Sequence, residues 1–104
     1  MNDINDYIPS PTEMQVQTIV RAKNRTKMEL KSTVVVLSDI IKRRSADGIG
    51  YIGTHDKEVK EQLATCPFIT WGMVVKVFRD AGYSIIGESN SISWATAEDI
   101  RKSE

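Results

Sequence analysis

The first half of this 104-residue chain carries one helical pattern that is too long for a domain of this size. Ser10 is a favourable N-cap residue and Pro11 suits the first helical position, so the helix should start here. Basic residues followed by Gly48 predict its end near Ala46. At ~1.5 Å per residue, a continuous helix would span roughly 50 Å. Part of it should therefore lie outside the chain's own core.

Apolar side chains recur in this segment in steps of four and three, the spacing of a helix stripe or a short coiled-coil seam. Two interpretations remain open. The helix either projects and pairs with another chain, or it breaks near residues 24–26, where Thr26 and Glu29 offer a second capping box. Lys23 and Lys27 interrupt the stripe at the same place. Either case leaves the segment with too little core of its own, so we expect a homo-oligomer. The expected interface residues are Val16, Val20, Leu30, Val34, Leu37 and Ile41.

The second half holds the apolar material for a core. Residues 68–94 contain both tryptophans and both phenylalanines. Their pattern predicts a nearly all-apolar helix over about 68–81, ended by Gly82. Before it, a short helix is predicted at 56–64 and a short extended segment at 49–53.

A small antiparallel hairpin is predicted over residues 83–95. The hairpin should be half-buried, with Ile92 and Trp94 on one face of its second strand and Ser91 and Ser93 on the other. Two strands alone are marginally stable, and the extended segment before the short helix is a candidate third strand.

These elements predict an α+β fold with a long N-terminal helix, a short strand, two helices and a C-terminal hairpin. The order of the two helices and the hairpin also matches a winged helix, which is the alternative fold. The chain should divide into a flexible leader (1–10), a helical segment (11–47), a compact α+β unit (48–96) and a tail (97–104).

Composition excludes several classes of protein. Fourteen Lys and Arg residues balance 14 Asp and Glu residues, so no global charge favours nucleic acid or an anionic membrane. The single Cys66 excludes an intramolecular disulfide. No apolar run approaches the ~20 residues of a membrane span, and the acidic N-terminus lacks the apolar region of a signal peptide. We expect a cytoplasmic protein without a membrane partner.

No group of residues has the pattern of a catalytic or metal site. His55 is the only histidine, and its neighbours Thr54 and Asp56 stand where helix caps belong. Cys66 lies eleven residues further on, so the two make no metal-binding set. Cys66 precedes Pro67 and is interpreted as a small buried apolar residue. We therefore predict a non-enzymatic protein with no cofactor and no metal.

Nucleic-acid binding is the first alternative function. A recognition helix should present polar or basic side chains at its start, but residues 68–73 read FITWGM, and the hairpin tip carries Glu88. Cations gather instead between residues 21 and 44, where eight bases accompany two acids. They could contact phosphate without sequence preference, or line a nucleotide or small-ligand pocket between subunits. The residues concerned are Arg21, Arg25, Lys42, Arg43 and Arg44.

The second half resembles short phage-encoded accessory proteins of unknown function. The resemblance lies in a helix followed by Gly-Tyr at 82–83, a hairpin, and Ile-Ser-Trp at 92–94. The extra short helix and the Cys-Pro break at 66–67 depart from that pattern. The resemblance implies a small accessory or assembly factor of a phage or mobile element, located in the host cytoplasm, and it carries over no active-site residues. Our first hypothesis is thus an interaction protein that self-associates through its N-terminal helix.

Overall fold

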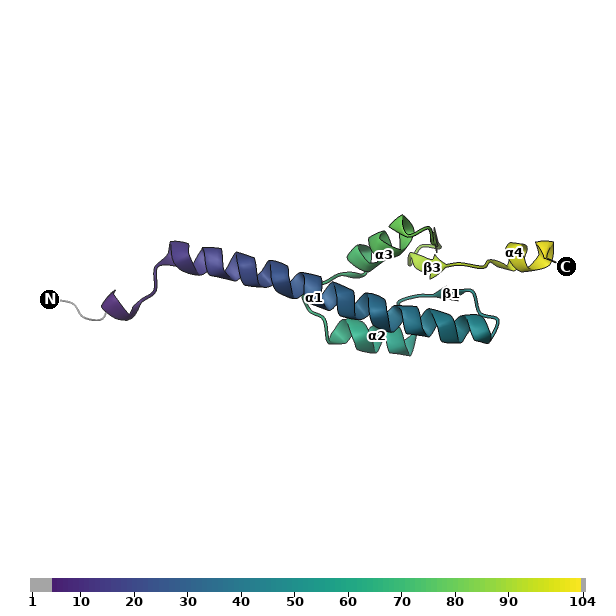
Figure 1. The fold of residues 1–104 in the computed structure, drawn as a ribbon, viewed down its shortest axis with the longest axis horizontal. Coiled ribbons are helices and arrows are strands. Elements are labelled where there is room, and N and C mark those ends of the chain that lie inside the picture. The colour runs from purple at the N-terminus through teal and green to yellow at the C-terminus, as the bar shows by residue number, and fades with distance from the viewer. Residues whose placement is uncertain (1–4, 104) are drawn as a thin grey trace.

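The computed structural model describes residues 5–103 and shows a rod with a compact unit along one half (Figure 1). It extends 83 × 22 × 21 Å, and its radius of gyration of 20.2 Å exceeds the ~13 Å of a compact chain of this length. The α+β prediction is confirmed. In chain order the elements are η1 (Asn5–Tyr7, a 3₁₀ turn), α1 (Pro11–Ala46), β1 (Tyr51–Ile52), α2 (Lys57–Ala64), α3 (Trp71–Asp80), β2 (Ser84–Ile86), β3 (Ser91–Ser93) and α4 (Ala97–Lys102).

Helix α1 is continuous over its 36 residues. Ser10 is its N-cap and accepts a hydrogen bond from the Glu13 N–H at 3.5 Å, as the sequence predicts. At the expected break, Thr26 does not cap a new helix. Its hydroxyl donates to the carbonyl oxygen of Ala22, 2.8 Å away and one turn earlier, which keeps it inside the helix. The interpretation with a break at 24–26 is therefore wrong, and the helix projects.

Glycines in the left-handed region end both long helices. Gly48 follows α1 with φ +78°, and Gly82 follows α3 with φ +103°. After α3, the Tyr83 N–H donates to the Phe78 carbonyl at 3.0 Å, which closes a Schellman motif. The equivalent bond closes α1, so the predicted stops are confirmed at both places.

Helix α3 begins at Trp71, three residues later than the apolar pattern predicts. Thr70 is the N-cap, and its hydroxyl accepts from the Met73 N–H at 3.3 Å. Phe68 lies in the loop before it, where its N–H donates to the Glu29 carboxylate on α1 at 3.1 Å. The predicted start at residue 68 is wrong because the backbone of Thr70 is extended (φ −118°, ψ 161°), so the helix begins only after this residue.

The three strands form one antiparallel sheet in the order β1-β3-β2. Ile92 on the central strand pairs with Ile52 of β1 on one side and with Ile85 of β2 on the other. The short extended segment is thus the third strand of the hairpin sheet, as the sequence suggested.

The prediction of a half-buried hairpin is wrong for strand β3, which is buried on both faces, whereas β2 is largely exposed. Ser91 and Ser93 are buried like Ile92 between them. The Ser93 hydroxyl donates to the Gly50 carbonyl at 3.2 Å, and a side chain at Gly53 would collide with the Ser91 hydroxyl. The segment around β1 therefore covers the serine side, and its glycines leave room for the serines.

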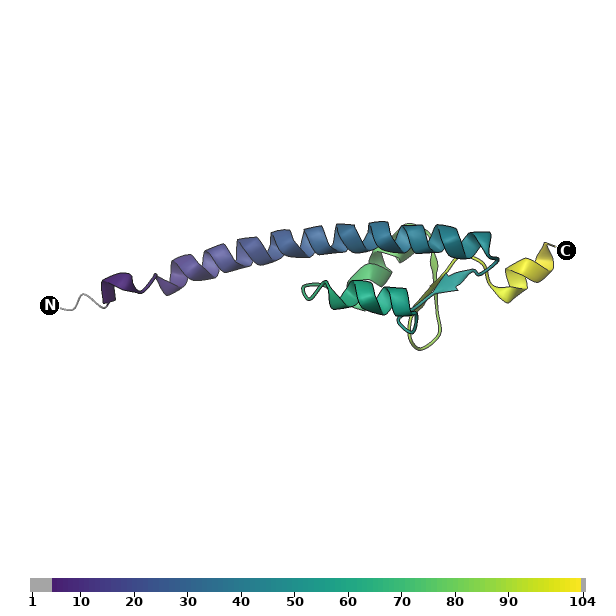
Figure 2. The same ribbon diagram turned by 90° about the horizontal axis from the view of Figure 1, so that it is seen from below.

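The core lies between the C-terminal half of α1, α2, α3 and the sheet, on one side of α1 (Figure 2). Phe78, Tyr83 and Trp94 extend it, with successive ring centres 5.4 and 6.3 Å apart. We call residues 29–96 the compact unit. The apolar side chains with at most 1% exposure are Leu37, Ile40, Ile52, Val59, Val74 and Ile92.

Two short elements, η1 and α4, lie near the two ends of the chain. Residues 5–7 of the predicted leader form η1, and residues 1–4 lie outside the described part. In the predicted tail, Thr96 and Asp99 form the capping box of α4, with N–H···O bonds of 2.9 and 3.2 Å. The backbone and side-chain hydrogen bonds from Thr96 hold the pKa of the Asp99 carboxyl below its usual value.

Candidate functional site

The N-terminal part of α1 lies outside the compact unit. We call residues 11–24 the arm, because the first polar or cation–π contact with the compact unit comes at Arg25. Every arm residue except Met14 and Ala22 is exposed. Within residues 5–103, no hydrogen bond or ion pair joins the arm to the compact unit. Figure 2 shows the arm extending freely past the compact unit.

The arm presents apolar side chains to solvent. Val16, Ile19 and Val20 are 57%, 47% and 52% exposed. The first two begin a series that continues along α1 in alternating steps of four and three. We call this series the seam, and its members are Val16, Ile19, Lys23, Thr26, Leu30, Thr33, Leu37 and Ile40. Its last four members face the core, so the apolar side of the arm continues the core-facing side of α1.

The six predicted interface residues separate into a buried and an exposed set. Leu37 and Ile41 lie in the core of this chain and form no free surface. Leu30 and Val34 are half-buried against the same core. Only the two arm valines remain exposed. The sequence prediction missed Ile19. This residue lies three positions after Val16 and four before Lys23, so it follows the same helical spacing.

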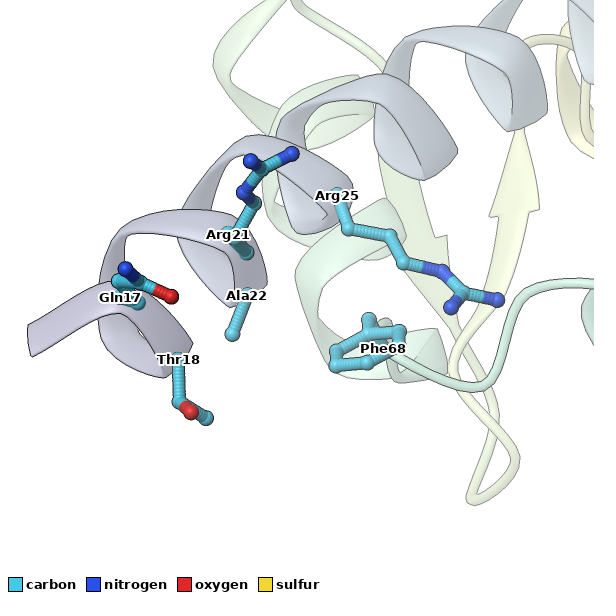
Figure 3. A pocket seen from close by; sticks show the side chains of 6 residues that line it. All are labelled: Gln17, Thr18, Arg21, Ala22, Arg25 and Phe68. Carbon is cyan, nitrogen blue, oxygen red and sulfur yellow. The ribbon is translucent and has the colours of Figure 1, made fainter. Parts of the chain in front are cut away.

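Where the arm meets the compact unit, Phe68 and α1 enclose an open cavity of about 320 Å³ that we call the corner (Figure 3). The Arg25 guanidinium carbon lies 4.6 Å from the centre of the Phe68 ring, a cation–π contact. Thr18 and Ala22 line the wall formed by α1, and Arg21 completes it. Among the described residues that line the corner, Arg21 and Arg25 are the basic ones and none is an acid. The nucleotide or small-ligand pocket between subunits stays a prediction.

The carboxylate of Glu29 contacts both Phe68 and Arg25, two of the residues that line the corner. The residue is only 9% exposed, and its Oε1 accepts the Phe68 N–H at 3.1 Å. Its Oε2 lies 3.6 Å from the Arg25 Nε, an ion pair, and accepts no hydrogen bond from the described residues. Glu29 therefore binds the loop before α3 to α1 and also holds Arg25 beside Phe68.

Ion pairs neutralise the two arginines at the C-terminal end of α1. Arg44 binds Asp56 at 3.1 Å, and both side chains are largely buried. The other carboxylate oxygen of Asp56 accepts the Gly53 N–H at 2.7 Å. Arg43 pairs with Glu58 at 3.1 Å on the surface. These contacts attach α1 to the start of α2 and give both arginines a structural role.

The remaining cations of the predicted anion site lie apart. Arg25 contacts the Phe68 ring and forms an ion pair with Glu29. Arg21 and Lys42 form no ion pair with the described residues, but 21 positions of α1, roughly 30 Å, separate them. The five predicted residues thus do not form one continuous basic surface.

The sequence singled out His55 and Cys66 for a possible catalytic or metal-binding role, and the structure shows the contacts of each. Cys66 is buried, and its sulfur accepts hydrogen bonds from the Thr33 hydroxyl and the Gln62 amide, both at 3.5 Å. His55 is exposed, with its ring centre 6.4 Å from that of Tyr51. Within the described residues, no three His, Cys, Asp or Glu side chains gather as a metal site.

No protein-family model matches the sequence, and no curated protein or solved structure shows significant similarity to it. In the part of the chain that the structure describes, no helix combines the length and apolar character needed to cross a membrane. Function is therefore inferred from the arm, the corner and the compact unit.

Proposed function

We propose that this chain is a non-enzymatic interaction protein that self-associates by pairing its arm with the arm of a second copy. The observation that supports the proposal is the arm itself. It consists of about four turns of helix with exposed apolar seam residues and, among the described residues, no polar contact with the compact unit. This is the assembly role that the resemblance to phage accessory proteins implies.

An arm of this kind gains little stability in a lone chain. Helices in proteins are stabilised mainly by packing of an apolar face, and isolated helices shorter than ~12–15 residues are marginal in water. Val16, Ile19 and Val20 are β-branched and favour a helix less than Leu or Ala does. A partner that covers the seam would supply the missing packing. A second copy offers the same seam in a two-fold arrangement.

Sedimentation velocity over a range of concentrations tests the proposal. Val16→Asp and Ile19→Asp place a carboxylate on the seam and should dissociate the oligomer. Gln17→Asp is the matched control, because it adds the same group to an exposed position on another side of the arm. We expect the control to associate like the wild type. A wild-type protein that stays monomeric at the highest concentration reached would overturn the proposal.

A second candidate, nucleic-acid binding by the compact unit, is favoured by the order of the elements. A helix, a strand, two helices and a hairpin joined by the first strand follow a winged-helix-like order. On α3, Lys76 and Arg79 are exposed three residues apart. The start of α3 is less suitable, because the Trp71 indole donates to the Asn90 carbonyl at 3.0 Å and the adjacent hairpin tip carries Glu88.

Fluorescence anisotropy with a labelled DNA duplex tests this second candidate. Binding should weaken steeply as the salt concentration rises. The double substitution Lys76→Glu with Arg79→Glu should abolish it, whereas Lys60→Glu, an exposed position on α2, should change it little. Absence of binding at low salt would eliminate the candidate.

A further inference from the structure

The seam packs the compact unit and also runs along the arm, and this constrains how two arms can pair. In the C-terminal half of α1, Leu37 and Ile40 bury the seam against α3 and the sheet. A straight helix drifts about 20° per heptad, so over the three heptads from Val16 to Leu37 the seam turns by roughly 60° and stays on the same half of the helix surface. A parallel partner helix would run along that side into the volume that the compact unit fills. An antiparallel partner would run outward past the start of α1, leaving the two compact units at opposite ends.

Building on the proposed self-association, we infer that the two arms pair antiparallel, with Val16 of each copy opposite Ile19 of the partner subunit. Two-fold symmetry repeats this contact and places both apolar seam residues of each arm against an apolar neighbour. Other registers do not. Pairing the two copies of Val16 would set Ile19 level with Glu13 of the partner subunit, an exposed acid.

The same register gives a partner to the lysine that interrupts the seam. Lys23 is exposed and forms no ion pair with the described residues. In the antiparallel register it lies level with Thr12 of the partner subunit and beside Glu13 of the partner subunit, so the two charges attract. In a parallel pair, the two copies of Lys23 would face each other and repel. The charge pattern of the arm thus favours the antiparallel orientation, as the shape of the monomer does.

The size of the arm limits the strength of the pair. Residues 11–24 are fewer than the roughly 20–30 residues per partner found in stable interfaces. The dimer should therefore dissociate on dilution, and a change in one charged pair should move its dissociation constant measurably.

Disulfide formation tests the orientation directly, because the two Cα atoms of a disulfide lie about 4.4–6.8 Å apart. Thr12→Cys and Lys23→Cys are prepared separately, oxidised alone, and oxidised as a mixture. The antiparallel register separates two copies of either cysteine by eleven positions, roughly 16 Å. Only the mixture should therefore form covalent dimers. Wild-type protein controls for Cys66, which is buried. Efficient cross-linking of either variant alone would overturn the antiparallel orientation.

A charge exchange tests the register. Glu13→Lys and Lys23→Glu should each raise the dissociation constant several-fold, because like charges then meet. The double variant should return it to the wild-type value. In a parallel pair neither single change alters the pattern of like charges facing each other. Single variants that match a dimeric wild type would overturn the register and leave self-association standing, whereas a monomeric wild type would remove both.

Discussion

Arg25 lies over Phe68, with its guanidinium carbon 4.6 Å from the ring centre, at the point where the arm leaves the compact unit. The N–H of Phe68 donates to Glu29, one turn further along α1. Because residues four apart share one helix face, the arginine and the acid hold the loop before α3 from two sides. This contact joins segments that are 39 residues apart in the chain and defines where the free arm begins.

Replacing the acid in this contact should destabilise the compact unit. Glu29→Ala removes the acceptor of the Phe68 N–H and should lower the free energy of unfolding by about 1–3 kcal/mol. Glu58→Ala is the control, because it breaks an exposed ion pair with Arg43 that should contribute at most about 1 kcal/mol. Urea unfolding followed by tryptophan fluorescence measures both. Equal losses would mean that Glu29 acts only as one more surface charge.

The two halves of the seam should respond differently to truncation. Leu37→Ala opens a cavity in the core and should cost about 2–5 kcal/mol of unfolding free energy. Val16→Ala should change the unfolding of the dilute monomer by less than about 0.5 kcal/mol, since this side chain is exposed in the single chain. Both variants are unfolded in urea at a concentration where wild type is monomeric. A large loss for Val16→Ala under these conditions would show that the arm is packed within its own chain.

Local signals in the sequence were sufficient for both ends of α1 and for the C-terminal end of α3. Ser10, Gly48 and Gly82 act within a few residues of themselves, so the chain alone identifies them. The third strand was also foreseeable, because a two-stranded hairpin needs a neighbour.

Features that depend on distant segments were not predictable. Phe68 lies in the loop before α3, and Glu29 on α1 holds that loop by accepting the Phe68 N–H. Ser91 and Ser93 are buried because glycines of the β1 segment lie against them. The seam has one periodicity throughout, so the sequence could not separate Leu37, which serves the core, from the residues left to the arm.

Two glycine substitutions should have opposite effects. Gly50→Ala would place a methyl group against the Ala95 carbonyl, in a segment where the Trp94 N–H donates to the Gly50 carbonyl at 2.9 Å. We expect a loss of about 1–3 kcal/mol in the free energy of unfolding. Gly72→Ala lies in the first turn of α3, and its nearest new neighbour is the Thr70 hydroxyl at 3.7 Å. It should gain about 0.4–1 kcal/mol, because alanine restricts the unfolded chain. Thermal unfolding of both variants is the measurement, and a stabilised Gly50→Ala would contradict the close approach of these backbones.

Helix α4 should lose order in acid. The Asp99 carboxylate accepts the N–H and the hydroxyl of Thr96, and these bonds lower its pKa below the ordinary value of 3.8. A carboxyl whose pKa is depressed by folding stabilises the folded state above its unfolded pKa of about 3.9. That contribution disappears as the pH falls through the lower, folded pKa. Amide chemical shifts of residues 97–102 should therefore report fraying below about pH 4.

Two variants separate this effect of the cap from a general effect of acid. Asp99→Ala removes the capping carboxylate, so α4 should already be frayed at neutral pH and its shifts should change little on acidification. Glu98→Ala removes an exposed acid from the same turn, which pairs with Lys102 at 3.4 Å, and should keep the acid transition of the wild type. An unchanged acid transition in Asp99→Ala would assign the pH dependence to a group other than the cap.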